Sequence, residues 1–108
     1  MAEYLQVLTT TARREDAESI ARLLLEKRLA ACVQVSGPVT SLYWWEGKIE
    51  RAEEWYCLAK SERRLYRRLE AAIRGAHAYE TPEILAAPVV EGSEEYLTWL
   101  SGELAPAQ

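Results

Sequence analysis

The stretch Val39–Glu50, which reads VTSLYWWEGKIE, decides the fold of this chain. Its middle is the densest aromatic run in the sequence, because Tyr43, Trp44 and Trp45 stand side by side. The polar turn signal Glu46-Gly47-Lys48 follows directly. Aromatic and β-branched residues beside a short glycine-containing turn are typical of a β-hairpin. The stretch therefore predicts a long hairpin with aromatic residues near its tip.

The second arm of this hairpin is expected over Glu50–Lys60, where apolar residues occupy both alternating sets of positions. Both faces of this arm are therefore expected to be partly covered. A domain of 108 residues cannot easily bury three large aromatic side chains near the tip of such an extension. We predict that another subunit completes the hairpin, with Tyr43, Trp44 and Trp45 in the subunit interface.

Length and composition indicate one globular domain over residues 1–108, with 49% hydrophobic and 28% charged residues. The formal net charge of −4 argues against binding to nucleic acid or to an anionic membrane surface, since both need a basic face. No apolar run approaches the roughly 20 residues that span a bilayer. The N-terminal sequence lacks the basic and apolar regions of a secretory signal, so the protein is either intracellular or has lost a leader, and we favour a cytoplasmic protein.

The remaining segments alternate between strand and helix patterns. Short apolar runs predict strands over Tyr4–Thr10, Ala31–Val35 and Ile84–Val90, and Gly37-Pro38 predicts a bend before the aromatic run. Apolar residues at helical spacing predict helices through Ala17–Leu24 and Leu65–Ile73, and a third helix follows Ser93. The order β-α-β-β-α-β plus a helix is the ferredoxin-like arrangement of an α+β protein, with two helices on one face of an antiparallel sheet.

Polar residues before the helical patterns suggest where the helices begin. Thr11, Ser61 and Ser93 are the predicted N-terminal caps, because their hydroxyl groups can accept a hydrogen bond from a free backbone N–H. Gly75 is the predicted end of the second helix.

Four segments in this order, LAACVQV, VTSLYWWEGKIE, HAYETPEILAAPV and EYLTWL, resemble the CutA family of divalent-cation tolerance proteins. The resemblance covers nearly the whole chain. It implies the ferredoxin-like fold, a tight PII-like homotrimer built by the long hairpins, and copper binding linked to tolerance of copper and other heavy metals. Two positions depart from the family pattern. Ala78 replaces the proline that commonly follows the loop histidine, and Thr9 and Thr10 stand where some members carry a cysteine.

His77, the single histidine, begins the pattern H-x-x-E-x-x-E with Glu80 and Glu83. Imidazole and carboxylate groups are suitable ligands for Cu²⁺ or Zn²⁺. The alternative is a loop histidine bonded to the backbone with two solvated glutamates, and spacing alone favours it because Pro82 breaks the helical register. The resemblance raises the metal-binding interpretation for His77, and it extends less strongly to Glu80 and Glu83.

Cys32 occupies a cysteine-bearing position of the family, and a thiolate suits Cu(I). The alternative is a small apolar residue in a strand, which is the commoner role of such a cysteine. Cys57 has no family match and is predicted to lie in the core. Neither cysteine belongs to a CxxC pattern, so both are expected to be free thiols.

Two other features allow more than one interpretation. The aromatic run could stack nucleic-acid bases, as in RNA-recognition sheets, but the basic RNP pattern is missing and interface packing is favoured. The arginines from Arg63 to Arg74 are interpreted as a solvated helix face, with an anion site as the alternative.

These observations favour a cytosolic, trimeric, non-enzymatic protein that binds copper or other divalent metal ions. The alternative is a PII-like signalling or structural trimer that binds a small ligand or a protein partner at clefts between subunits. No motif commits the chain to an enzymatic reaction.

Overall fold

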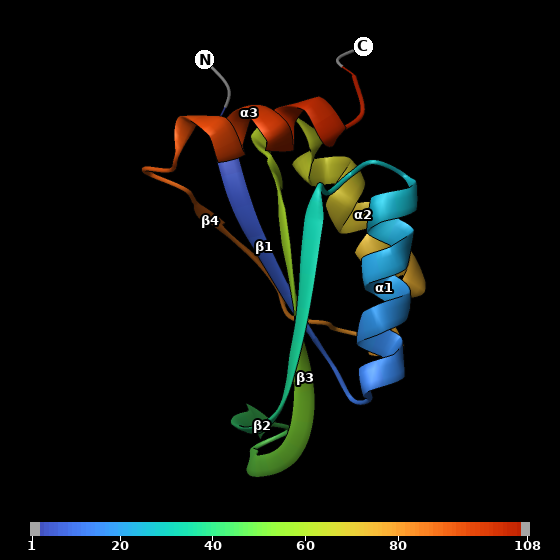
Figure 1. Ribbon diagram of the computed structural model, residues 1–108. Helices are drawn as coiled ribbons and strands as arrows, with labels where there is room; N and C mark the ends of the chain where they lie inside the picture. The colour runs from blue at the N-terminus through green and yellow to red at the C-terminus, as the bar shows by residue number, and fades with distance from the viewer. Residues whose placement is uncertain (1–2, 107–108) are drawn as a thin grey trace.

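Residues 3–106 are described by a computed structural model in which an antiparallel sheet has the strand order β2-β3-β1-β4 (Figure 1). In chain order the elements are β1 Tyr4–Thr11, α1 Arg14–Glu26, β2 Cys32–Trp45, β3 Lys48–Glu62, a 3-10 turn Arg63–Leu65, α2 Tyr66–Ala76, β4 Ile84–Pro88 and α3 Glu94–Glu103. This order and topology confirm the ferredoxin-like α+β prediction. None of the helices within residues 3–106 is long and apolar enough to cross a membrane.

The core lies between the sheet and the helices α1 and α2, which cover the same side of it (Figure 1). Side chains of a strand alternate between faces, and the odd-numbered residues of β1 and β3 point to this helix face. Leu5 and Val7 of β1 are buried there beside their cross-strand partners Ser61 and Ala59. The predicted apolar stripes are buried at Ala17, Ile20, Ala21, Leu24, Leu65, Leu69 and Ile73, and Ala72, which was predicted with them, is partly buried. Leu65 belongs to the 3-10 turn that precedes α2.

The β2–β3 hairpin extends well past the sandwich, as Figure 1 shows at its lower end. Its strands have 14 and 15 residues, whereas β1 has 8. Glu46 and Gly47 form the turn with φ of 51° and 79°, and Trp45 pairs with Lys48. Two residues with positive φ match the twist of a two-residue hairpin. The return strand thus begins at Lys48, two residues earlier than its predicted start at Glu50.

The predicted bend at Gly37-Pro38 is a bulge in β2, where the pairing shifts between Ser36 and Val39. Gly37 has a φ of 149°, and a Cβ atom added there would lie 2.8 Å from the Trp55 ring. Glycine is needed because the indole packs directly against the backbone. Across the bulge Val39 takes the same face of the sheet as Ser36, so the alternation is offset by one residue from there to the tip.

Several predicted element ends are wrong. Thr11 is the last residue of β1, and α1 follows Arg13, which makes no side-chain cap. Ser61 lies inside β3 and its buried hydroxyl donates to the Leu29 carbonyl (2.6 Å), so a tertiary contact replaces the predicted cap. Gly75 lies inside α2. The last strand ends at Pro88 and not at Val90. Ser93 does cap α3, because its Oγ accepts the Tyr96 N–H at 3.1 Å.

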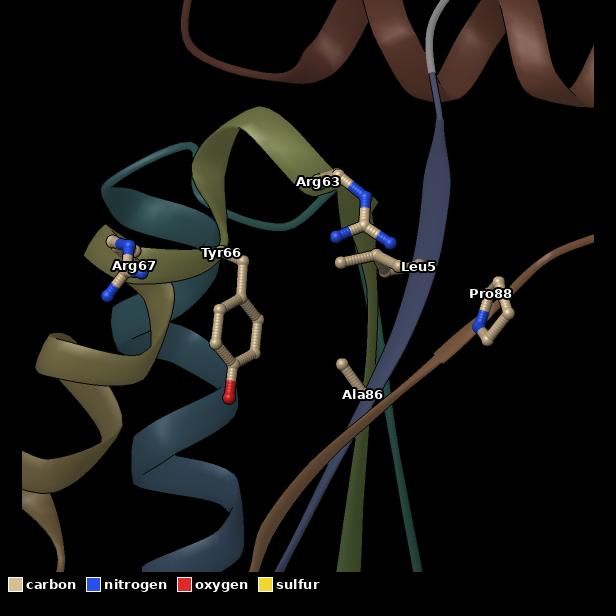
Figure 2. Close-up of a pocket in the computed structure, with 6 residues that line it drawn as sticks. All are labelled: Leu5, Arg63, Tyr66, Arg67, Ala86 and Pro88. Atoms are coloured by element: carbon tan, nitrogen blue, oxygen red, sulfur yellow. The ribbon is translucent and has the colours of Figure 1, made fainter.

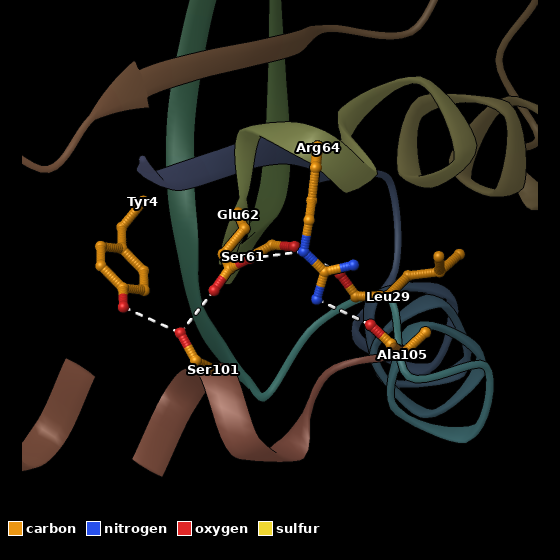
Figure 3. A network of polar contacts seen from close by, with 7 residues as sticks. All are labelled: Tyr4, Leu29, Ser61, Glu62, Arg64, Ser101 and Ala105. Carbon is orange, nitrogen blue, oxygen red and sulfur yellow. Dashed lines mark hydrogen bonds and ion pairs between the residues drawn. The ribbon is translucent and has the colours of Figure 1, made fainter. Parts of the chain in front are cut away.

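A polar network ties α3 to the end of the sheet (Figure 3). The Ser101 hydroxyl donates to the carboxylate of Glu62 and accepts from the Tyr4 hydroxyl at 2.8 Å. Arg64 donates to Glu62 Oε1 at 2.6 Å and to the carbonyl of Ala105 at 2.7 Å. Glu62 is 5% exposed, so its charge is compensated by these donors and not by bulk water. The network fixes both α3 and the segment that follows it.

Candidate functional site

His77 directly follows α2 and begins the loop that leads to β4. Its Nδ1 accepts the backbone N–H of Tyr79 at 3.0 Å, and its Nε2 lies 2.7 Å from the carbonyl oxygen of Thr10. Because the Thr10 oxygen can only accept, Nε2 carries the proton and Nδ1 presents its lone pair. The loop therefore holds the imidazole in one tautomer and one orientation.

Tyr79 extends this cluster to strand β3. Its ring centroid is 4.8 Å from that of His77, and its hydroxyl donates to Glu54 Oε2 at 2.7 Å. Burial raises the pKa of the Tyr79 phenol well above its usual value, and the hydrogen bond and negative charge of Glu54 raise it further. Glu54 is 7% exposed. The sequence-based site did not include Tyr79 or Glu54, although an acidic residue inside an apolar strand is a signal that could have identified Glu54.

The two loop glutamates do not take part in the contacts among His77, Tyr79 and Glu54. Glu80 and Glu83 are exposed, and neither is hydrogen-bonded to His77. Within residues 3–106 no group of three or more His, Cys, Asp and Glu side chains is arranged to hold a metal ion. His77 is thus the one predicted ligand that the fold orients, and Glu80 and Glu83 remain solvated neighbours.

Cys32 lies far from His77 along the sheet. Cys32 of β2 pairs with Lys60 of β3, and Lys60 pairs in turn with Gln6 of β1. His77 contacts Thr10, which lies further along β1. Four residues of extended strand separate these levels by about 14 Å. Cys32 and His77 of one chain therefore cannot bind the same ion. Cys32 instead neighbours Tyr96 of α3, and the pKa of the Tyr96 phenol is raised first by burial and then by its interaction with the Cys32 side chain.

Cys57 lies in the core as predicted, with 1% of its surface exposed and its thiol 3.7 Å from the Ala17 carbonyl. Burial raises the pKa of this thiol from 9.0 to about 11. Above pH 9 the unfolded chain loses the thiol proton while the folded chain keeps it, so the unfolded state binds fewer protons. The free energy of unfolding is therefore expected to fall between pH 9 and 11, by roughly 2–3 kcal/mol in the limit.

Urea unfolding at pH 8, 9 and 10 checks this expectation. Cys57→Ala should show a shallower loss of stability over this range than the parent protein, whatever its stability at pH 8. Parallel curves for the two proteins would assign the alkaline loss to other groups.

The aromatic side chains of the hairpin are exposed in the single chain. The cross-strand pairing places Leu42, Trp44 and Ile49 on one face, where they are 67%, 72% and 65% exposed. Tyr43 and Trp45 lie on the opposite face at 43% and 50% exposure. Contiguous apolar surface of this kind on a soluble protein marks an interaction site. The predicted subunit interface remains a prediction that this surface supports.

The chain is thus a small ferredoxin-like α+β protein with an extended aromatic hairpin and an oriented histidine before its last strand. Residues 5–103 match the model of the CutA1 divalent ion tolerance protein family. The chain belongs to this family, as the resemblance of its four segments predicted.

Curated relatives and a solved structure agree with this assignment. The divalent-cation tolerance protein CutA of Thermus thermophilus is 40% identical over 94 residues, which cover 87% of this chain and 91% of the relative. That of Pectobacterium atrosepticum is 39% identical over 104 residues, which cover 96% and 94% of the two chains. The crystal structure of CutA1 from Oryza sativa superimposes with a TM-score of 0.94 at 30% identity, over 97% of this chain and 96% of that one.

Proposed function

We propose that this chain is a cytosolic, non-enzymatic homotrimer that binds copper and other divalent metal ions and contributes to tolerance of them. The observation that carries this proposal is the oriented imidazole of His77 in a member of the divalent ion tolerance family. Copper(II) and zinc favour imidazole nitrogen ligands.

The hydrogen bonds of His77 suit a ligand that binds through Nδ1. Metal-binding histidines usually donate their other ring N–H to a carbonyl or a carboxylate, and Nε2 already does so to Thr10. Nδ1 carries no proton, so binding there requires only that the Tyr79 N–H be released. A hydrogen bond of this kind contributes about 1 kcal/mol, which is small beside the affinity of a metal site.

A complete ligand set would come from more than one chain. His77 is the one predicted ligand that the fold of a single chain orients, and Cys32 lies at another level of the sheet. The exposed aromatic hairpin favours a trimer in which copies of the chain lie against one another. Ligands from neighbouring subunits would then supplement His77, with Glu80 and Glu83 available on the same loop.

Both cysteines are free thiols, which is compatible with the proposed cytosolic location. Cys57 faces the helices and Cys32 the opposite side of the sheet, so they could not pair within a chain in any compartment, and the location is decided by experiment. A solved relative from Archaeoglobus fulgidus, 38% identical, is described as periplasmic, and cell fractionation distinguishes the two locations.

Calorimetric titration of the assembled protein with Cu²⁺ tests the role of His77. His77→Ala is expected to weaken binding by at least about tenfold or to remove one equivalent of metal, since the loss of a residue that only hydrogen-bonds to a metal ligand already costs about 10–100-fold in affinity. Tyr79→Phe is the matched control, because it removes the bond to Glu54 and leaves the imidazole in place.

Equal affinity and stoichiometry in His77→Ala and the parent protein would exclude His77 from the site. Equal losses in both variants would mean that loop structure, and not the imidazole, controls binding. If the parent protein binds no divalent metal, the alternative of a PII-like trimer that binds a small ligand or protein partner takes precedence.

A further inference from the structure

A pocket of about 350 Å³ lies between the start of α2 and the edge strand β4 (Figure 2). It is lined by Leu5, Arg63, Tyr66, Arg67, Ala86 and Pro88. Volumes from about 300 Å³ upward accommodate small ligands. The pocket faces the helical layer at the Leu5 end of β1, whereas His77 lies at the Thr10 end, so the two sites are separate.

The pocket exists because the helical layer does not extend over β4. Ala86 and Pro88 pair with Val7 and Leu5 of β1, and they lie on the same face as those buried residues. Their small side chains leave space where a longer residue would fill the edge of the core. In Figure 2 the ring of Tyr66 stands across the opening from Ala86 and Pro88. The result is a slot with an aromatic wall on one side and an aliphatic wall on the other.

Two arginines line this slot and make its surroundings positive, and in Figure 2 they lie on opposite sides of the Tyr66 ring. Arg63 forms an ion pair with Glu3, in which both side chains are exposed. Arg67 forms no ion pair with any residue in the part of the chain that the structure describes, 3–106. An exposed pair such as Arg63–Glu3 is weak, so an incoming anion can share or replace the Glu3 carboxylate. Positive charge is thus available here although the whole chain carries a net charge of −4.

We propose that this slot binds a small anion that carries a flat apolar ring, with a carboxylate or phosphate as its charged group. Arg63 binds the anionic group through charge-assisted hydrogen bonds, for which the planar guanidinium is well suited, and Arg67 adds positive charge on the other side of Tyr66. The ring lies between Tyr66 and the wall formed by Ala86 and Pro88, where stacking and apolar burial hold it. This binding is independent of metal binding at His77.

Titrations of the full chain with four probes, followed by amide NMR shifts, test the ligand class. Phenyl phosphate and benzoate carry both features, inorganic phosphate lacks the ring, and benzyl alcohol lacks the charge. We expect at least one of the two ring anions to bind about tenfold more tightly than inorganic phosphate and benzyl alcohol, with shifts at residues 63–67 and 86–88. The tighter ring anion identifies the preferred charged group. If neither ring anion binds more tightly than inorganic phosphate, the proposal is wrong.

Variants that change one charge type at a time distinguish binding in the pocket from general attraction by charges elsewhere on the chain. Arg63→Gln/Arg67→Gln should weaken the ring anion at least about tenfold, and Arg68→Gln, which changes an arginine outside the pocket, should leave it within about twofold. Glu3→Gln should tighten binding by about two- to fivefold because the internal competitor is lost. Glu15→Gln makes the same charge change at the start of α1 and should have no effect. Equal effects at positions 63/67 and 68 would overturn the proposal.

A steric variant tests the slot without a change of charge. Ala86 is exposed, so Ala86→Leu fills the pocket with little effect on folding. Binding of the ring anion should fall by about tenfold while the thermal unfolding midpoint remains that of the parent protein. Unchanged affinity in a folded Ala86→Leu protein would place the ligand elsewhere.

Discussion

Replacing Trp44 with aspartate is expected to convert the proposed trimer into monomers of 12.3 kDa. Trp44, Leu42 and Ile49 form the most exposed apolar face of the hairpin, and 72% of the Trp44 surface is open in the single chain. The substitution therefore leaves the fold of the monomer intact. In the trimer it would bury three unpaired carboxylates, each at a cost of several kcal/mol. Light scattering on a sizing column measures the mass, and circular dichroism verifies the fold.

Two further variants make this experiment specific. Ala71→Asp places the same charge on an exposed position of α2 and should leave the assembly unchanged. Trp45→Asp changes the opposite face of the hairpin, at 50% exposure, and is also expected to disrupt the interface. A stable trimer in both tryptophan variants would show that the hairpin tip faces solvent, and the interface would then have to lie elsewhere.

Replacing Glu62 with alanine is expected to lower the free energy of unfolding by about 2–3 kcal/mol. The buried carboxylate accepts hydrogen bonds from Ser101 and Arg64, and Arg64 also holds the carbonyl of Ala105 (Figure 3). Without it a guanidinium and a hydroxyl lose their partner, and α3 loses its attachment to the sheet. For a domain of this size the melting temperature should fall by roughly 10–20 °C. Differential scanning calorimetry measures the fall.

The exposed pair Arg28–Glu103 is the matched control for this network. Its oxygen and nitrogen lie 3.1 Å apart, but both side chains are about half exposed. Glu103→Ala should cost less than about 1 kcal/mol. Glu62→Gln keeps an acceptor of the same shape, so its loss of unfolding free energy should lie between those of Glu62→Ala and Glu103→Ala. A Glu62→Ala protein as stable as Glu103→Ala would mean that α3 is held by its apolar contacts alone.

The sequence predicted the architecture because periodicity is a local signal. The stripe from Ala17 to Leu24 and the turn at Gly47 carry their information within a few residues, and both agree with the structure. The ends of elements were less predictable. Ser61 has the chemistry of a helix cap, but its cross-strand pairing with Leu5 and its bond to Leu29 keep it in β3. A tertiary contact of this kind has no local signature.

The candidate site was predictable in part for the same reason. The alternative in which His77 is bonded to the backbone has the hydrogen bonds seen in the structure, although its Nδ1 remains suited to a metal ion. The Tyr79–Glu54 bond joins residues 25 positions apart, and it depends on the strand register, which spacing alone does not specify. The separation of Cys32 from His77 likewise follows from strand pairing.

The bulge at Gly37-Pro38 limits the insertions and deletions that this hairpin can accept during evolution. Side chains alternate with a period of two, so the loss or gain of one residue there would exchange the two faces of the entire tip. Length variation in this arm is therefore constrained to even steps. The adjacent tryptophans make this constraint weaker, because Trp44 and Trp45 point to opposite faces of the hairpin. Whichever face is turned toward a partner, it carries one indole. After a change of one residue in length, one of these two indoles would therefore still lie on the face that contacts a partner.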